Sequence, residues 1–390
     1  MVAAVMPSRV GRAVGSTHFG LGLPGLEKIT SIQGSDSFSI ASAVGLETCE
    51  LVLVAGTWGT LVRVGPTGVV SDKPRRIPGG PMGVVLESVR NDEIPAWSRD
   101  PPWLGVIDIE TLQVRGIPVP NHPWSKLEVG PVTGMDRGLY AMAAISDPGF
   151  PRAEPRSWLG TPLISLFDVD GVVQHSLGEI ADREGRYLTW LGSRASIGVI
   201  ADTLLAVFLA DATLERFELT PQGWIRPDRG KGSLPRYLRA PEPIEEVRSA
   251  PWIDVNGDLP RVHHVPQVAA AAVGPGGKIF ALRNYEARWV AHEAPTWRVQ
   301  RRWEVTSWGL EVYDSFGEVV GRFAFPVGQK TGRWIRVDPV GRLLMPEPGG
   351  VGVWRDPTYT GPTCPAVPSV IPVSSVDAPP SPDSILAYPW

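Results

Sequence analysis

Two neighbouring stretches, VAAAAVGPGGKIFALR at residues 268–283 and LEVYDSFGEVVGRF at residues 310–323, each consist of two apolar runs joined by a glycine-containing turn. Glycine readily adopts the positive φ angles that tight connections between antiparallel strands need. We therefore expect each stretch to form a β-hairpin. The small residues of the first hairpin, Ala269 to Ala272, suit strands that crowd together near a common axis. The two hairpins together predict a four-stranded sheet.

This pair of hairpins recurs along the chain. Hairpins of the first kind are expected at 131–145, 196–209 and 334–347, and hairpins of the second kind at 61–70, 106–117, 164–177 and 214–224. Pairing them gives six units, at 38–73, 82–117, 131–177, 196–224, 268–323 and 334–355. Four-stranded units repeated at this spacing are typical of a β-propeller. We therefore predict an all-β fold, a six-bladed β-propeller with four-stranded antiparallel blades.

The sixth unit has only three evident strands, so another segment must complete it. We expect residues 26–33, LEKITSIQ, to supply the missing strand, so that an N-terminal strand closes the ring. The alternative is a leader strand on the surface. The expected organisation is an irregular N-terminal leader at 1–25, the propeller at 26–356 and a Pro-rich C-terminal tail at 357–390.

The segments VGPGGKIFALR, GLEVYDSFGEVVGRF and VDPVGRLLMPEPGGVGVW resemble the repeats of bacterial six-bladed propellers of the NHL-like and TolB-like type. In those repeats an inner hairpin with a D-x-x-G turn is followed by an outer hairpin. The resemblance covers about residues 268–355 and is diffuse over the first half of the chain. It implies a toroid with a central channel. Many such proteins are binding or scaffolding modules, and some related six-bladed folds are lactonases, esterases or lyases, but the pattern carries no catalytic residues.

The overall composition excludes several classes of protein. The chain has 37 Lys plus Arg against 41 Asp plus Glu, a net charge of -4, which argues against nucleic acid as a partner. Its most apolar window, 197–214, carries Asp202 and Asp211 and is too short for a membrane span. The N-terminal residues lack the order of a signal peptide. We expect a soluble protein, cytoplasmic as the chain is written and extracytoplasmic if the true start lies upstream; the sequence leaves the oligomeric state open.

The long connections are expected on one face of the ring. With the strands of a blade labelled A to D from the axis outward, B–C loops and D-to-A crossovers share a face, and A–B and C–D turns share the other. We expect B–C loops at 90–103, 146–158 and 284–308, and crossovers at 118–130, 178–194 and 225–267. Most of the 15 tryptophans lie in these segments.

Trp and Arg dominate binding hot spots, because each contributes a large rigid surface or several hydrogen bonds. The loop-rich face is therefore predicted to carry a contact patch, with a self-packed lid of loops as the alternative. Its expected residues are Trp97, Trp103, Trp158, Arg288, Trp289, Trp297, Arg301, Arg302, Trp303 and Trp308.

Motifs for chemistry are sparse. The segment DVNGD at 254–258 begins like a calcium loop but has Leu259 at position six and Val265 at position twelve, so we interpret it as a polar turn and expect no metal site. No GxSxG, HExxH or P-loop motif occurs, and we expect no cofactor. His263 and His264 precede an inner strand and are candidates for the channel mouth, where at most one of them faces the channel.

Cys49 and Cys364 are the only cysteines. They lie in the first unit and just after the sixth, which are neighbours in a closed ring. A disulfide between them and two free, separately buried thiols are both open from the sequence.

Together these observations favour a non-catalytic binding or assembly module that holds a protein or carbohydrate partner on its Trp/Arg-rich loop face. The alternative is a hydrolase, lactonase or lyase with its site at the channel mouth. The sequence names no catalytic residue for it, so an enzyme is the less favoured class.

Overall fold

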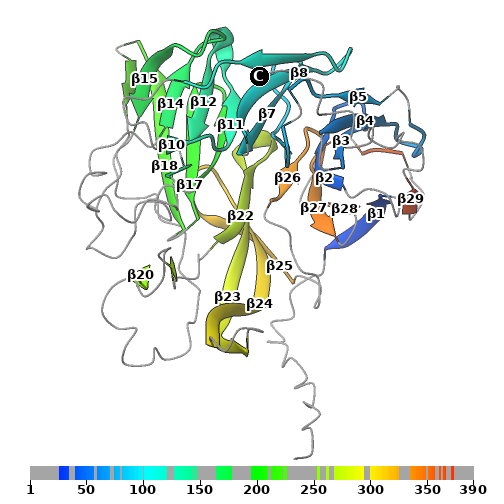
Figure 1. Cartoon of the computed structure of the whole chain (residues 1–390), viewed down its shortest axis with the longest axis vertical. Helices are drawn as coiled ribbons and strands as arrows, with labels where there is room; N and C mark the ends of the chain where they lie inside the picture. Colours follow the sequence, from blue (N-terminus) through cyan, green and yellow to red (C-terminus); the bar gives the residue numbers. More distant parts are fainter. Residues whose placement is uncertain are drawn as a thin grey trace, which may run out of the picture.

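A computed structural model of the chain describes the residues that form the ring and parts of its connections (Figure 1). The described residues are 26–34, 40–56, 59–70, 74–79, 81–99, 101–120, 127–143, 145–146, 164–177, 195–209, 212–221, 223–225, 253–254, 261–262, 268–293, 299–324, 334–347, 350–355, 360–361, 363–365 and 370–372. They form six sheets of four or five strands, which confirms the predicted six-bladed β-propeller. Within the described part of the chain, no helix is long and apolar enough to cross a bilayer.

Blades 1 to 5 are antiparallel meanders whose strands follow one another outward in chain order. Blade 1 consists of β2 (Ile40–Gly45), β3 (Leu51–Ala55), β4 (Thr60–Val64) and β5 (Arg75–Arg76). Blade 2 consists of β6 (Val85–Leu86), β7 (Glu93–Arg99), β8 (Pro102–Asp108) and β9 (Val114–Ile117). Blade 3 consists of β11 (Val132–Gly134), β12 (Tyr140–Ala143), β14 (Ile164–Phe167) and β15 (Val173–Leu177).

Blade 4 consists of β16 (Ala195–Ile200), β17 (Thr203–Phe208), β18 (Thr213–Thr220) and β19 (Gly223–Ile225). Blade 5 consists of β22 (Val268–Val273), β23 (Ile279–Glu293), β24 (Val299–Tyr313) and β25 (Val319–Ala324). Two small two-stranded sheets lie in the connections, formed by β10 (Leu127–Glu128) with β13 (Ile145–Ser146) and by β20 (Ile253–Asp254) with β21 (Arg261–Val262).

Blade 6 closes the ring with a strand from the other end of the chain, as expected. Its strands β26 (Arg336–Val337), β27 (Arg342–Glu347) and β28 (Gly350–Arg355) are completed by β1 (Glu27–Gln33), which pairs antiparallel with β28. A fifth strand, β29 (Val370–Pro372), then pairs parallel with β1. The first and the last described strands of the chain, β1 and β29, therefore lie in one sheet. The division of the chain into leader, propeller and tail stays a prediction, because residues 1–25 and most of 357–390 lie outside the described residues.

The hydrophobic core is divided into interfaces between blades. Six clusters of buried side chains are present among the described residues, one between each pair of neighbouring blades. At the closing junction, for example, Ile32 of β1 and Val351 of β28 pack with Leu53 and Val62 of blade 1. Because each blade buries apolar surface on both faces, an open ring would expose two apolar faces to water.

The D-x-x-G segments form the predicted tight turns. Asp314 in the C–D turn of blade 5 accepts backbone hydrogen bonds at Oδ1 from Phe316 and Glu318, both at 2.9 Å, and Gly317 adopts a φ of 90°. Asp168 and Asp338 accept the same two bonds in blades 3 and 6. An aspartate four residues before the returning strand therefore fixes the turn by its own side chain.

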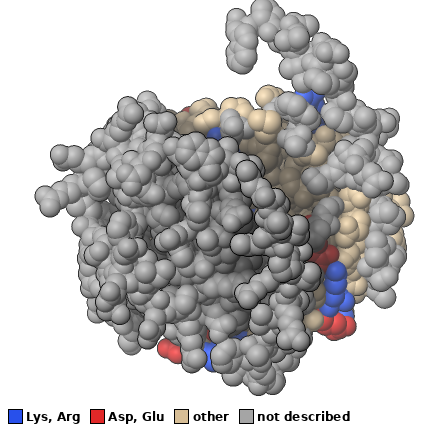
Figure 2. All heavy atoms as spheres, turned by 60° about the horizontal axis from the view of Figure 1, so that its bottom comes forward, with Lys and Arg blue, Asp and Glu red and all other residues tan. Residues whose placement is uncertain are grey.

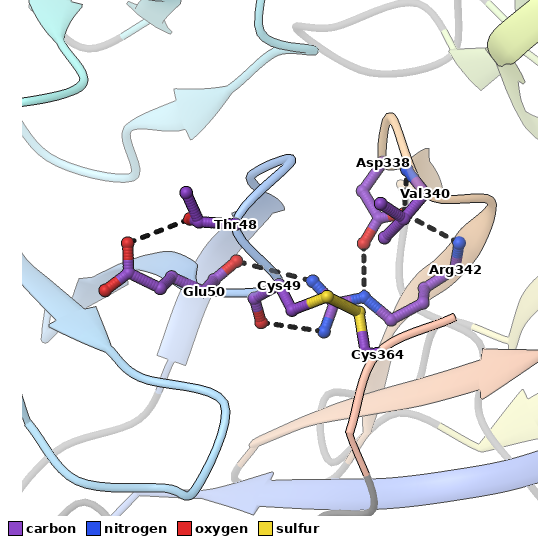
Figure 3. Close-up of a disulfide and its surroundings, with 7 residues drawn as sticks. All are labelled: Thr48, Cys49, Glu50, Asp338, Val340, Arg342 and Cys364. Carbon is purple, nitrogen blue, oxygen red and sulfur yellow. Dashed lines mark hydrogen bonds and ion pairs between the residues drawn. A yellow bond between two sulfur atoms is a disulfide. The ribbon is translucent and has the colours of Figure 1, made fainter. Parts of the chain in front are cut away.

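The junction between blades 1 and 6 is also linked covalently (Figure 3). Cys49, in the A–B turn of blade 1, forms a disulfide with Cys364, which selects the first of the two alternatives left open by the sequence. Beside it, Arg342 of β27 donates hydrogen bonds to the backbone oxygens of Cys49 (2.9 Å) and Glu50 (3.3 Å). The carboxylate of Asp338 accepts a further bond from Arg342 Nε. Ring closure is therefore stabilised by a strand, a disulfide and a buried ion pair.

Two segments expected as loops are strands instead. The prediction of a B–C loop at 90–103 is wrong, because β7 and β8 occupy this range and only residues 100–101 separate them. Prolines at 95, 101 and 102 made the segment look like a loop. The segment 284–308 does connect strands B and C of blade 5, but largely as a continuation of β23 and β24.

Candidate functional site

A cavity of about 320 Å³ lies at the end of the channel where the A–B turns converge. All six blades contribute to its lining, mostly through the last residues of their A strands and the turns that follow. The lining residues are Glu47, Glu87, Ser88, Val89, Arg90, Thr133, Ile197, Gly198, Val199, Val273, Gly274, Pro275, Val337, Asp338 and Pro339. The cavity is thus on the face opposite to the B–C loops on which the predicted contact patch was placed.

Glu87 enters the cavity because Pro95 ends the pairing of β6. Val85 pairs with Trp97 and Leu86 with Ala96, so Glu87 and Pro95 are next in register. The Glu87 N–H donates to the Pro95 carbonyl at 2.8 Å. Proline has no N–H to return the second bond of such a pair, and the ladder stops there. Strand β6 is therefore only two residues long, and residues 87–90 line the cavity instead.

The Glu87 side chain forms a buried ion pair with Arg336 of blade 6. Arg336 Nη2 lies 2.9 Å from Glu87 Oε1, and the side chains are 8% and 9% exposed. The guanidinium also donates to the carbonyls of Leu86 (2.6 Å) and Ile335 (2.8 Å), and Trp97 Nε1 donates to Glu87 Oε1 at 2.7 Å. Because blade 1 lies between blades 6 and 2, this pair joins blades that are not neighbours in the ring.

Burial dominates the electrostatics of this pair. It raises the pKa of Glu87 above its ordinary value, although the Arg336 charge and the Trp97 hydrogen bond act in the opposite direction. It also lowers the pKa of Arg336, against the attraction of Glu87. Both groups therefore depend on each other to remain charged inside the protein.

Arg90 forms a second connection across the ring. It lies at the start of a two-residue turn in which Asn91 and Asp92 have φ angles of 51° and 61°, as in a type I′ hairpin. Its guanidinium donates to the Val199 carbonyl of blade 4 at 3.2 Å and to Asp136 Oδ1 of blade 3 at 3.1 Å. The positive charge of Arg90 is thus already engaged by the protein.

The other two acidic groups of the cavity, Asp338 and Glu47, differ in whether their oxygens are already hydrogen-bonded within the protein. Burial raises the pKa of Asp338, but both of its oxygens accept hydrogen bonds within its own turn, including the one from Arg342. Glu47 is exposed, in the A–B turn of blade 1. Among the described residues, no group of His, Cys, Asp and Glu side chains could hold a metal ion.

The predicted contact patch is partly brought together by strands β23 and β24. These strands run beyond the ring as a two-stranded ribbon, which we call the blade 5 ribbon, residues 285–307 (Figure 1). Its register places Trp289 opposite Trp303, Ala291 opposite Arg301, Val290 opposite Arg302 and Arg288 opposite Glu304. Because opposite positions share a face and adjacent positions alternate, positions 289, 301 and 303 share one face and positions 288 and 302 share the other.

The remaining predicted residues lie at the base of the ribbon, in blade 2 or outside the described residues. Trp308 pairs with Asn284 at the base of the ribbon. Trp97 of β7 and Trp103 of β8 are half-buried. In sequence, one precedes and the other follows the short connection between these two strands. The Trp103 indole lies so close to Gly105 that an added Cβ would be 2.6 Å from its Cη2. The other four, Trp158, Trp297, His263 and His264, lie outside the described residues.

Sequence patterns missed the cavity because no local motif encodes it. Its carboxylates and Arg90 come from blades 1, 2 and 6, at positions between residues 47 and 338 of the sequence. One signal was available: the Asn-Asp pair at 91–92 between two apolar runs is a hairpin turn signature. Placing an A–B turn there would have put Glu87 at the end of an inner strand.

Sheet order and ring closure define the chain as a six-bladed β-propeller. No protein-family model and no curated protein matches its sequence. Among solved structures it is similar to the β-propeller domain of Cps50 (Swd1) from Myceliophteria thermophila, with 11% identity, 81% of this chain and 83% of that chain covered, and a TM-score of 0.43. It is also similar to the WD40 β-propeller domain of Doa1 (9% identity, 86% and 98% covered, TM-score 0.45) and to a streptogramin B lyase (10% identity, 83% and 96% covered, TM-score 0.43). Likenesses this distant concern the fold alone.

Proposed function

We propose that this protein is a non-catalytic binding or assembly module that holds a protein or carbohydrate partner through the blade 5 ribbon. The partner contacts would come from the Trp and Arg side chains of the ribbon, including Trp297, together with Trp158 from the connection between strands B and C of blade 3. The resemblance of residues 268–355 to NHL-like and TolB-like repeats, many of which serve in binding, is in keeping with this role.

The observation that carries the proposal is the length of β23 and β24. Each has 15 residues, whereas β18, the longest of the other described strands, has eight. Pairing continues beyond the blade from Asn284 opposite Trp308 to Glu293 opposite Val299. A two-stranded ribbon is at best marginally stable by itself and adds no strand to the blade. A partner that pairs with its edges and contacts its aromatic positions would give a reason for its length.

The charge distribution agrees with a partner that is not a polyanion. Figure 2 looks at the end of the molecule from which the ribbon extends. Among the described residues in that view, charged side chains are few, and blue and red groups adjoin at the lower right. The whole chain carries a net charge of -4, which gives no general attraction for a polyanion.

Arrays of immobilised glycans and of immobilised peptides test the proposal with two forms of the chain. The first is the full chain. The second has residues 286–306 replaced with Asn-Gly, which closes β23 on β24 directly above Asn284 and Trp308 by a two-residue turn. We expect the full chain to bind one class of array and the trimmed chain to lose that binding while its Tm stays within a few degrees. Equal binding by both forms would refute the role of the ribbon.

The alternative function, a hydrolase, lactonase or lyase, is favoured by one observation, the buried carboxylate of Glu87 beside the hydroxyl-bearing Ser88 and Thr133 in the channel cavity. A panel of lactone and ester substrates separates the two functions. Turnover that Glu87→Gln abolishes would support an enzyme. No turnover in a chain that binds its partner would support the binding module.

A further inference from the structure

The channel cavity has an acceptor that the protein leaves unused. Glu87 Oε1 accepts a hydrogen bond from Trp97 and is ion-paired with Arg336, but no described residue donates a hydrogen bond to Oε2. The side chain is 9% exposed and lines the cavity. Oε2 is not one of the buried polar atoms that lack a partner, so it is open to the cavity. A carboxylate oxygen accepts two hydrogen bonds, and a ligand with N–H or O–H donors can therefore bond to it.

The charges that line the cavity select among such ligands. Three lining side chains are acidic and one, Arg90, is basic, and the Arg90 guanidinium is bound to Val199 and Asp136. Glu47 accepts no hydrogen bond and forms no ion pair with a described residue. An anionic ligand would meet the unpaired charge of Glu47, whereas a cationic one would be attracted by Glu47 and could donate a hydrogen bond to Glu87 Oε2.

The volume of the cavity and the apolar part of its lining indicate the size and kind of ligand it can hold. A volume of about 320 Å³ lies at the lower end of the usual range for small-molecule sites, roughly 300–1,000 Å³. Val89, Val199 and Val273 supply apolar surface for a short carbon chain. We propose that the channel cavity binds a small organic amine whose ammonium group donates hydrogen bonds to Glu87, with Glu47 as the second carboxylate. This site is independent of the blade 5 ribbon.

Isothermal titration calorimetry of the full chain at neutral pH and low salt tests the class of ligand. The probes are 1,4-diaminobutane as the amine, glucose as a neutral polyol and citrate as an anion. We expect saturable binding of one diaminobutane per chain, and at least tenfold weaker or absent binding of the other two. Binding of glucose or citrate but not of diaminobutane would overturn the proposal, as would no binding of any probe.

Two variants locate the site. Ser88→Phe fills the cavity without touching the Glu87–Arg336 pair, and Ser176→Phe makes the same change at an exposed position on β15. We expect Ser88→Phe to abolish diaminobutane binding and Ser176→Phe to leave it unchanged. Glu87→Gln should weaken it at least tenfold; should that variant fail to fold, Ser88→Phe decides. Unaltered binding by Ser88→Phe would place the amine elsewhere and overturn the proposal. The ribbon-trimmed chain should bind diaminobutane like the full chain, so that failure of one proposal is distinguishable from failure of the other.

Discussion

Glu87 and Arg336 form a buried ion pair on which both the stability of the ring and the shape of its cavity depend. A buried ion pair gains little over an apolar pair of the same size, because both charges lose their hydration, but removing one partner leaves an uncompensated charge. Here the pair also links blade 2 to blade 6, although blade 1 lies between them in the ring. We expect its value to lie in fixing the position of Glu87 at the cavity.

Arg336→Met should therefore destabilise the protein by about 3–5 kcal/mol near neutral pH. The double variant Arg336→Met/Glu87→Leu should recover most of this loss, because neither charge is then left buried. Urea denaturation of the wild type, both single variants and the double variant measures the coupling. Additive losses in the double variant would show that the pair is not coupled.

The same variant predicts a pH dependence. Burial already raises the pKa of Glu87, and Arg336→Met removes the charge that opposes this shift. When the pKa of a carboxyl is higher in the folded than in the unfolded protein, its protonated form favours folding. This stabilisation is lost as the pH rises through the pKa of the folded protein. The destabilisation by Arg336→Met should thus be smaller near pH 5 than near pH 8. An equal loss at both pH values would contradict it.

Gly45 tests the packing at the closing junction. A Cβ at this position would lie 2.5 Å from Asp338 Cβ, and Asp338 is fixed by its hydrogen bonds and is 1% exposed. Gly45→Ala should cost about 1–3 kcal/mol through overpacking. Gly116→Ala is the matched control, because a Cβ there has nothing within 4 Å, and its effect should be within about 0.5 kcal/mol. Equal melting temperatures for the two variants would contradict the close contact.

Among the strands, β1 closes the ring, so its removal should lower the stability of the whole propeller. It pairs with β28 from Glu27 to Gln33, and Ile32 is fully buried against blade 1. Deleting residues 1–35 removes β1, whereas deleting 1–24 keeps it. Loss of roughly 4 kcal/mol of apolar burial, at about 2–4 °C per kcal/mol, predicts a Tm about 10 °C lower for the first deletion than for the second. Equal melting temperatures would contradict closure by β1.

The elements that the sequence predicts well are those with strong local chemistry. Apolar alternation with D-x-x-G turns locates the outer hairpins, and the missing fourth strand of blade 6 predicts β1. Strand β7 was missed because Pro95 argues against a strand interior. Pro95 lies opposite Glu87, just beyond the last paired residue of β6. Its missing N–H therefore removes only one hydrogen bond from the sheet. The cavity could not be predicted, since its groups meet only when all six blades are in place.

At the scale of the whole molecule, the disulfide closes a loop of sequence separation 315. In the chain-entropy model, a loop of this length contributes about 6 kcal/mol, and measured values for disulfides are typically 2–4 kcal/mol. Cys364→Ser should therefore lower the free energy of unfolding by about 2–5 kcal/mol. Guanidinium denaturation with and without a reducing agent checks this. The wild type should lose a similar amount on reduction and Cys364→Ser should not respond; a reductant effect of equal size in both would refute the bridge.

The central claim is that the blade 5 ribbon binds the partner. The measurement that tests it most directly is the dissociation constant of Trp297→Ala and Arg301→Ala for the ligand found on the arrays, with their melting curves. Arg75→Ala, at an exposed arginine of β5, is the control. We predict that each ribbon variant loses about 2 kcal/mol or more of binding free energy, roughly thirtyfold in affinity, while its Tm stays within a few degrees and Arg75→Ala binds like the wild type. Wild-type affinity in both ribbon variants, or unfolding in place of lost binding, would contradict the claim.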